Sequence, residues 1–288
     1  MRSIIIIGNS AAGLSCASAI RQQDAESKIT IVSDENRPAY QRFKLFDYLY
    51  QQVKESALFE PYQDFYQRNN IELVNNIVSA VDPSKKRIYF KEKGFLEFDK
   101  LVIACGRKPK MPQIKGVNKN GVVSIYNLDD VKHILEIIPL LQTVCIAGDN
   151  GIADKLTEFF VRRKIEVKLL RSQLKEGLQM DLVEHISDAQ IQEILGEGDI
   201  KAVKLSNNKI IGTNLVVYTQ VLSPNIDLVK ETSIECNNGI MVDSSMLTSV
   251  QDIYAAGDVA EIRGQEKQYS WVNAEQEGTA AGRSICQN

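Results

Sequence analysis

The sequence predicts an α/β protein made of two parallel-sheet domains. Short apolar runs alternate with longer amphipathic stretches along the 288 residues, which is typical of parallel strands joined by helices. Two strand–turn–helix–strand units of similar design begin at residues 3 and 143. Between them, residues 107–121 hold two prolines, two glycines and five cationic side chains, and such a segment predicts a domain boundary.

The first unit opens with an apolar strand at residues 3–8 (SIIIIG). A helix with small residues on one face is predicted at 11–22, and a second strand at 28–35. Together they form a βαβ unit of about 30 residues. Two helical stretches rich in aromatic residues follow at 43–53 and 62–70. A hairpin is predicted at 87–98, turning at Lys93-Gly94, and a buried strand at 100–106.

The second unit repeats this order with a strand at 143–148, a helix at 152–164 and a strand at 165–170. Further strands are expected within 199–205, 209–212 and 214–219. An apolar strand within 252–262 runs into a glycine, and a closing helix is predicted at 271–287. Two βαβ units of one design indicate two related, three-layer nucleotide-binding domains of the Rossmann type.

Composition excludes several classes of function. The net charge of −3 argues against nucleic acid or an anionic membrane as the main partner. No apolar run approaches the roughly 20 residues that span a bilayer. The five cysteines are scattered and odd in number, and there are only two histidines, so we expect neither a disulfide framework nor a metal site. A cytoplasmic location is the expectation that follows.

The turn after the first strand, GNSAAG at 8–13, departs from the pattern GxGxxG only at Ser10. Gly8 allows the tight turn, a small residue at position 10 lets backbone N–H groups approach a diphosphate, and Gly13 lets the helix pack on the sheet. Asp34 follows the second strand, where a carboxylate can bond ribose hydroxyls. Strand, turn, helix, strand and acid in this order predict a dinucleotide site.

With these motifs the chain resembles, over nearly its whole length, the single-FAD flavoproteins of the pyridine nucleotide–disulfide oxidoreductase fold. The branch it resembles most contains NADH:rubredoxin reductase, oxygenase-coupled ferredoxin reductases and the flavin part of nitrite reductase. The matching segments are IIIIGNSAAGLSCASAI, SDENRPAYQRFKLFDYL, IVSAVD (77–82), LVIACGRKP (101–109), DIYAAGDVAE and SWVNAEQEGTAAG (270–282). In LVIACGRKP, Cys105 stands where the family has threonine.

The resemblance implies an FAD-binding domain formed by residues 1–110 and 240–288, and an NAD(P)-binding-like domain at 111–239. It implies that Asp34 holds the adenosine ribose, that Asp258 bonds the ribityl chain, and that the start of the last helix lies beside the isoalloxazine. The FAD contacts that it implies are Gly8, Ser10, Ala11, Ala12, Gly13, Asp34, Glu35, Arg42, Val78, Ala104, Gly106, Gly257, Asp258, Trp271, Asn273 and Ala274.

The sequence also departs from the family. No positioned redox cysteine is present, so electrons are expected to pass through flavin directly. The family's further C-terminal domain, which covers the flavin and forms a dimer interface, is expected to be absent. In the second turn, GDNGIA at 148–153, Asn150 and Ala153 stand where glycines belong, and Asp149 and Asp154 add negative charge near the diphosphate. Thr219 and Gln220 are bulkier than the family's residues near the nicotinamide. The residues left for NAD(P) are Gly148, Asn150, Gly151 and Arg171, with the arginine suited to a 2′-phosphate.

Three functions remain open at this point. The first is an NAD(P)H-dependent flavin reductase that delivers electrons to a small rubredoxin- or ferredoxin-like protein. The second is a flavin-only electron-transfer subunit whose flavin is reached by, or covered by, a partner subunit. The third is an FAD-binding partner protein without catalysis. The state of the second turn discriminates between the first two.

Overall fold

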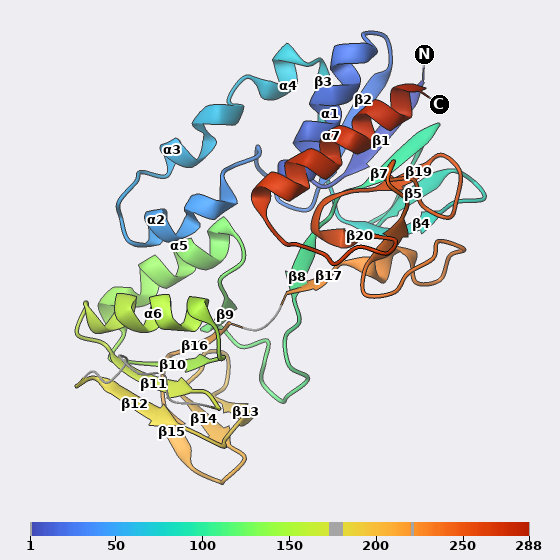
Figure 1. Ribbon diagram of the computed structural model, residues 1–288. Coiled ribbons are helices and arrows are strands. Elements are labelled where there is room, and N and C mark those ends of the chain that lie inside the picture. The colour runs from blue at the N-terminus through green and yellow to red at the C-terminus, as the bar shows by residue number, and fades with distance from the viewer. Residues whose placement is uncertain (1, 173–180, 220–221, 288) are drawn as a thin grey trace. The chain divides into compact units, whose positions relative to one another are not determined.

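The computed structural model describes residues 2–172, 181–219 and 222–287. The chain divides into two units. Unit 1 comprises Met1–Phe43, Glu55–Lys108 and Ser223–Asn288, and unit 2 comprises Lys44–Lys54 and Pro109–Leu222. The chain passes between the units after Phe43 and after Lys54, and again within strands β8 (Arg107–Pro109) and β17 (Leu222–Pro224), which pair with each other. Figure 1 shows the course of the chain.

The bounds of the units differ from the predicted domain bounds at residues 109–110, which lie in unit 2, and in two longer segments. Residues 44–54 belong to unit 2, where the Tyr50 hydroxyl donates to the carbonyl of Lys155 over 2.7 Å and its ring meets Phe159 edge-on at 5.3 Å. Residues 223–239 belong to unit 1, where the N–H of Asn225 donates to the carbonyl of Gly106 over 2.9 Å.

Unit 1 is built on a five-stranded parallel sheet in the order β19-β7-β1-β2-β3. The strands are β1 (Ser3–Ile7), β2 (Lys28–Ser33), β3 (Ile71–Asn75), β7 (Lys100–Ile103) and β19 (Ile253–Ala255). The sequence of β1 is continuously apolar because a central parallel strand is buried on both faces. Helices α1 (Ala11–Gln23) and α7 (Trp271–Gln287) lie side by side against this sheet (Figure 1).

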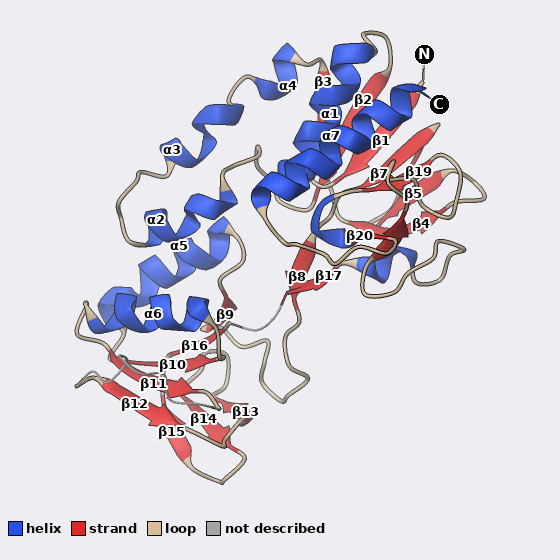
Figure 2. Ribbon diagram, in the orientation of Figure 1, coloured by secondary structure: helices blue, strands red, loops and turns tan. Residues whose placement is uncertain are grey.

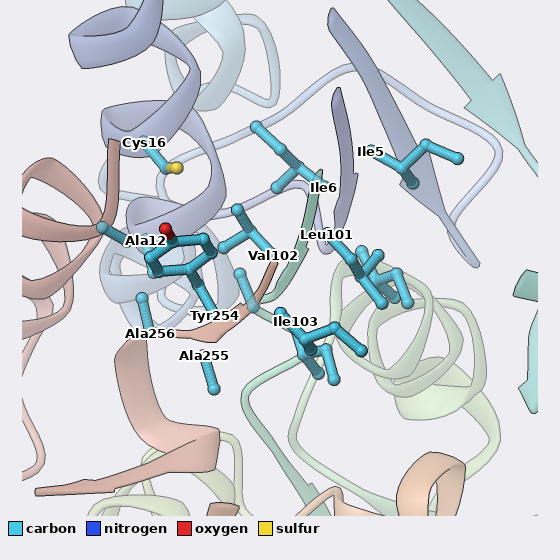
Figure 3. Close-up of a cluster of buried hydrophobic side chains, with 14 of the residues drawn as sticks. Ile5, Ile6, Ala12, Cys16, Leu101, Val102, Ile103, Tyr254, Ala255 and Ala256 are labelled. Atoms are coloured by element: carbon cyan, nitrogen blue, oxygen red, sulfur yellow. The ribbon is translucent and has the colours of Figure 1, made fainter. Parts of the chain in front are cut away.

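The core of unit 1 lies between the sheet and these helices. Side chains of β1, β7 and β19 converge there with those of α1 (Figure 3), and Ile6, Val102 and Tyr254 are at most 1% exposed. Burying each such apolar side chain stabilises the fold by about 1.5–3 kcal/mol. Helices α1 and α7 approach so closely that a Cβ at Gly278 would lie 2.1 Å from the carbonyl oxygen of Ala12. Only glycine at that position allows this packing.

Smaller elements complete unit 1. An antiparallel sheet joins β4 (Val78–Asp82), β5 (Arg87–Phe90) and β6 (Phe95–Glu97), and it confirms the hairpin turn at Gly94, whose φ is +118°. Strands β18 (Ile240–Val242) and β20 (Ala260–Ile262) pair in parallel. The short helices are α3 (Ser56–Phe59) and α4 (Phe65–Arg68), with 3-10 turns η1 (Arg42–Lys44), η2 (Glu60–Tyr62), η4 (Ile226–Val229) and η5 (Gly257–Val259).

Unit 2 repeats the design with a parallel sheet in the order β12-β11-β10-β16-β9 (Figure 2). Its strands are β9 (Val122–Ser124), β10 (Thr143–Ala147), β11 (Glu166–Leu170), β12 (Val183–Ile186) and β16 (Leu215–Tyr218). An antiparallel sheet joins β13 (Ile191–Leu195), β14 (Ala202–Leu205) and β15 (Ile210–Gly212). The helices are α2 (Leu45–Leu49), α5 (Leu128–Ile137) and α6 (Gly151–Val161), with the 3-10 turn η3 (Ile138–Leu140).

The predicted fold class is confirmed, because each unit carries a parallel sheet with βαβ connections. The closing helix begins and ends where the sequence predicted it. Within the described ranges, no helix is both long enough and apolar enough to cross a membrane.

Candidate functional site

The first turn of unit 1 is held by backbone packed on backbone. Gly8 has a φ of +122°, and a Cβ there would lie 2.2 Å from the carbonyl oxygen of Ala104. A Cβ at Gly13 would lie 2.0 Å from the carbonyl oxygen of Gly8. The turn therefore folds back on itself and on the end of β7, in a way that only glycine permits at both positions.

The N-terminus of α1 emerges from this turn with the properties of an anion site. Ser10 is the N-cap in an extended conformation, and its side chain makes no capping hydrogen bond in the structure as described. The first turn contains no acidic residue. The N–H groups of Ala11, Ala12 and Gly13 thus lie at the positive end of a 13-residue helix without a side-chain acceptor. This donor set fits a diphosphate.

Two acids follow β2, and the structure separates their roles. Asp34 is exposed. The Glu35 side chain is 12% exposed and accepts from the Tyr40 hydroxyl over 2.9 Å and from the Arg42 guanidinium, with Arg37 at 3.9 Å. Glu35 and Arg42 therefore hold the loop together, whereas the Asp34 carboxylate remains the one accessible to a ribose.

The sequence analysis missed a polar link behind the first turn. The Tyr66 hydroxyl donates to Asn9 Oδ1 over 2.7 Å and accepts from the N–H of Ala39 over 2.9 Å. Burial raises the pKa of Tyr66, so the hydroxyl keeps its proton and its donor role. The link joins the turn to the loop after β2, across a sequence separation that no local pattern reveals.

A second cluster holds the Gly257–Asp258 turn. The N–H of Gly257 donates to Glu277 Oε2 over 2.9 Å, and its carbonyl accepts from Lys267 Nζ over 3.0 Å. Lys267 and Glu277 pair at 2.6 Å, and their side chains are 13% and 12% exposed. Gly257 has a φ of +76°, and a Cβ there would lie 2.8 Å from the Cβ of Ala12. This ion pair therefore ties the turn to α7, beside the start of α1.

Asp258 has a cationic partner that sequence analysis did not find. Arg107 Nε donates to Asp258 Oδ2 over 2.9 Å, and the Arg107 guanidinium lies 3.7 Å from the centre of the Tyr269 ring. The two side chains of the pair are 18% and 27% exposed. The stacking orients the arginine, and the arginine in turn orients the carboxylate that the sequence assigns to the ribityl chain.

The start of α7 presents a second helix N-terminus in the same unit. Ser270 Oγ accepts from the N–H of Asn273 over 3.1 Å, and the first turn contains no acidic residue. The Asn273 amide donates to the carbonyl of Gln268 over 3.1 Å. Trp271 is half-buried, donates from Nε1 to Glu275 Oε1 over 2.8 Å, and meets the Phe43 ring edge-on at 5.1 Å.

The structure thus brings many of the predicted FAD contacts together. Gly8, Ala12, Gly13, Ala104 and Gly257 are in mutual backbone or Cβ proximity through these close approaches. The Cβ of Ala274 lies 3.7 Å from a Cβ built at Gly257. Gly106 lies between β7 and β8 with a φ of +63°, and Val78 begins β4 with 9% exposure. Their roles toward a cofactor stay predictions.

All five cysteines are free thiols. Burial raises the pKa of Cys16, and it raises the pKa of Cys105 and Cys145 to about 12. Cys105 Sγ donates to the carbonyl of Asn225 over 3.4 Å. These three thiols stay protonated near neutral pH, and a protonated thiol is a poor nucleophile.

The second turn, in unit 2, is built differently. Asn150 is the N-cap of α6, and its Oδ1 accepts from the N–H groups of Ile152 and Ala153, both over 3.1 Å. Its amide donates to the carbonyl of Thr219. A Cβ at Gly148 would lie 2.0 Å from Thr219 Oγ1, whereas a Cβ at Gly151 would meet nothing within 4 Å. Gln220 lies outside the described residues.

Arg171 is bonded to both acids of this turn. Its guanidinium donates to Asp149 Oδ1 over 2.6 and 3.0 Å and to Asp154 Oδ1 over 2.7 Å. The Arg171 side chain is 5% exposed. Ser172 Oγ donates to Asp149 Oδ2 over 2.5 Å, and the hydrogen bonds from Ser172 and Arg171 lower the pKa of Asp149. The arginine proposed for a 2′-phosphate is therefore occupied by carboxylates.

The sequence of this chain is similar to those of known proteins over most of its length. NADH-rubredoxin oxidoreductase of Clostridium acetobutylicum is 27% identical over 292 residues, which covers 98% of this chain and 74% of that protein. Nitrite reductase [NAD(P)H] of Bacillus subtilis is 27% identical over 287 residues, which covers 91% of this chain but only 35% of that protein. The chain thus spans about a third of one relative and about three quarters of the other.

Solved structures agree in fold. The putidaredoxin reductase of a covalent complex with putidaredoxin superposes with a TM-score of 0.88 at 20% identity, covering 100% of this chain and 76% of that one. NADH:rubredoxin oxidoreductase from Clostridium acetobutylicum superposes with a TM-score of 0.79 at 23% identity, covering 99% and 75%. The family model for pyridine nucleotide-disulphide oxidoreductases matches residues 2–278. The chain belongs to the pyridine nucleotide-disulphide oxidoreductase family.

Proposed function

We propose that this chain is an FAD-dependent oxidoreductase that passes electrons through flavin, without a redox disulfide, to a protein or small acceptor. The observation that carries the proposal is the glycine-built turn at Gly8–Gly13, which ends in an uncapped helix N-terminus free of acids. Membership of the family and relatives named as oxidoreductases support it.

The residues proposed to hold FAD form three groups. The first turn and its helix, with the N–H groups of Ala11 to Gly13, would bind the diphosphate. The exposed Asp34 would bond the adenosine ribose. Asp258, oriented by Arg107, would bond the ribityl chain, and the start of α7 near Trp271 would lie beside the isoalloxazine. Bound FAD would supply the exchange of electrons between a donor and an acceptor.

The protein's own contribution is binding and electrostatics. The positive ends of α1 and α7 favour negative charge at the diphosphate and at the ring edge, respectively. The Lys267–Glu277 pair fixes the Gly257–Asp258 turn. The raised pKa of the buried Cys105 thiol keeps it protonated, so no thiolate competes for electrons near the site.

The proposed acceptor is a small iron protein of the rubredoxin or ferredoxin kind, in the cytoplasm. Relatives carry the names NADH-rubredoxin oxidoreductase and ferredoxin–NAD(+) reductase component, and one structural neighbour is a reductase bound to putidaredoxin. The five free thiols are compatible with a reducing compartment.

The test starts from purified protein loaded with FAD. We expect about one FAD per chain, bleaching by dithionite under anaerobic conditions, and re-oxidation on adding an oxidised rubredoxin or ferredoxin. A protein that does not bind FAD would refute the whole proposal. FAD that binds but resists both reduction and re-oxidation would instead indicate a non-catalytic FAD-binding partner.

A further inference from the structure

We infer that unit 2 does not bind a pyridine dinucleotide at its GDNGIA turn, because its own side chains already take the donors and the space that a diphosphate would use. The inference rests on the proposed function, since it decides how electrons reach the flavin. It comes from comparing two turns of the same design, the first turn at 8–13 and the second turn at 148–153.

The donors are taken in the second turn and available in the first. In α6, the Asn150 side chain accepts from the N–H groups of Ile152 and Ala153, two donors of the first helical turn. In α1, the Ser10 side chain makes no such bond. An anion at α6 would have to displace the asparagine, whose amide is also bonded to the carbonyl of Thr219.

Arg171, the cation that could meet a phosphate at the second turn, is already bonded to carboxylates. Asp149 and Asp154 lie at this helix end, and Arg171 is their shared partner. The arginine is 5% exposed and bonded on Nε, Nη1 and Nη2. To reach a ligand phosphate, the Arg171 guanidinium would have to give up these hydrogen bonds to carboxylates.

The space beside the glycine is filled as well. Gly148 has a φ of +154°, and the position of its missing Cβ is 2.0 Å from Thr219 Oγ1. Thr219 is 4% exposed, and its N–H donates to the carbonyl of Ala147 over 2.9 Å. The Thr219 hydroxyl therefore fills the space beside Gly148, and the backbone of Thr219 is tied to the end of β10.

The Asn150 cap, the Arg171 ion pairs and the Thr219 side chain lie at one helix end. Together they satisfy the second turn without a bound ligand. A turn that had lost only one glycine would still offer free backbone N–H donors to a diphosphate. Here the cap, the ion pairs and the threonine each replace one property of a diphosphate site. Electrons for the flavin are then supplied by a reductant that does not dock at this turn.

The experiment measures nucleotide binding to the FAD-loaded protein by isothermal titration calorimetry with NADH and NADPH. We expect no saturable binding up to on the order of 1 mM for the wild type. In the Asp149→Gly/Asn150→Gly variant we expect affinity for NADH to rise at least about tenfold. Glycine is nearly as good an N-cap as asparagine, so the variant should fold, which its FAD content and thermal unfolding would verify.

Asn127→Gly is the matched control. Asn127 caps α5 in the same unit and accepts from the N–H of Asp130 over 2.9 Å, so its removal alters a helix cap without touching the second turn. The control should bind no nucleotide. Saturable wild-type binding at micromolar NADH would overturn the inference, and so would a folded, FAD-loaded double variant without any gain. A wild-type protein that does not bind FAD would instead refute the proposed function.

Discussion

A methyl group at Gly13 should separate FAD binding from folding. In Gly13→Ala the new Cβ would lie 2.0 Å from the carbonyl oxygen of Gly8, whereas ordinary van der Waals contact begins at 3.4 Å, so the two backbone segments must move apart by about 1.4 Å. The Gly8 carbonyl belongs to the backbone, and the position of a Cβ is fixed by the backbone, so neither group can rotate away. The N–H groups at the start of α1 shift with them.

The magnitudes follow from this displacement. Overpacking of this kind destabilises by about 1–3 kcal/mol, and replacing glycine in a helix returns about 1 kcal/mol, so the free energy of unfolding should fall by about 0–2 kcal/mol. Each hydrogen bond to a charged group is worth about 1.5–3 kcal/mol. Losing two such bonds to the diphosphate should weaken FAD binding by about 3–6 kcal/mol, or roughly 10²- to 10⁴-fold.

The assay is a fluorescence titration of the FAD-depleted protein with FAD, with unfolding in urea measured in parallel. Gly151→Ala is the control, because it adds the same methyl group to the first turn of α6, where nothing lies within 4 Å. It should leave FAD affinity unchanged. If Gly13→Ala binds FAD within about threefold of the wild type, the Gly8–Gly13 turn does not hold the diphosphate and the reasoning fails.

Three further outcomes are expected. Arg107→Met should weaken FAD binding about tenfold, because Asp258 loses a charge-assisted hydrogen bond that orients it, and Arg107→Lys should restore part of it; equal dissociation constants for all three proteins would contradict the positioning role. Native alkylation at pH 7 should leave flavin re-oxidation intact, because burial raises the pKa of Cys105 to about 12; inactivation at unchanged FAD content would show that a thiol takes part. The pKa of Asp24 is lowered from 3.8 to about 2, chiefly by its hydrogen bond with Ser27. The contribution of Asp24 to stability is therefore present above pH 3.8 and is lost as the pH falls toward 2. An Asp24→Asn variant should show a flatter acid dependence of the free energy of unfolding, and parallel wild-type and variant curves would disprove this.

The elements that sequence predicted well are those with a strong local signal. The βαβ start of unit 1, the hairpin at Gly94 and the closing helix α7 all follow from apolar periodicity and glycine position. The short strands β3 and β9 and the helix α5 were not predicted. Helix α2 was predicted as helical, but its place in unit 2 depends on Tyr50 packing on Phe159, a contact between residues distant in sequence.

The residues of the candidate site also fall into those that a local sequence signal predicted and those that it did not. The glycine turn and Asp34 were visible because their spacing is local. The pairs Arg107–Asp258 and Lys267–Gly257 were not, because ion pairs and side-chain-to-backbone bonds across long sequence separations leave no periodic trace. For the second turn, sequence showed the added negative charge but not its partner. That Arg171 lies between the two carboxylates emerges only from the folded chain.

The division of unit 1 into three chain segments has a consequence for biosynthesis. Every residue of unit 2 is made before residue 223, whereas β19 and α7, which complete the sheet and the helix pair of unit 1, come afterwards. As the chain leaves the ribosome, unit 2 can fold while α1 still lacks the helix that covers it. The Gly257–Asp258 turn and its clamp, Glu277, are among the last parts to emerge. The proposed FAD site is therefore complete only when residues 257–278 have been made, however early the glycine turn at the N-terminus is available.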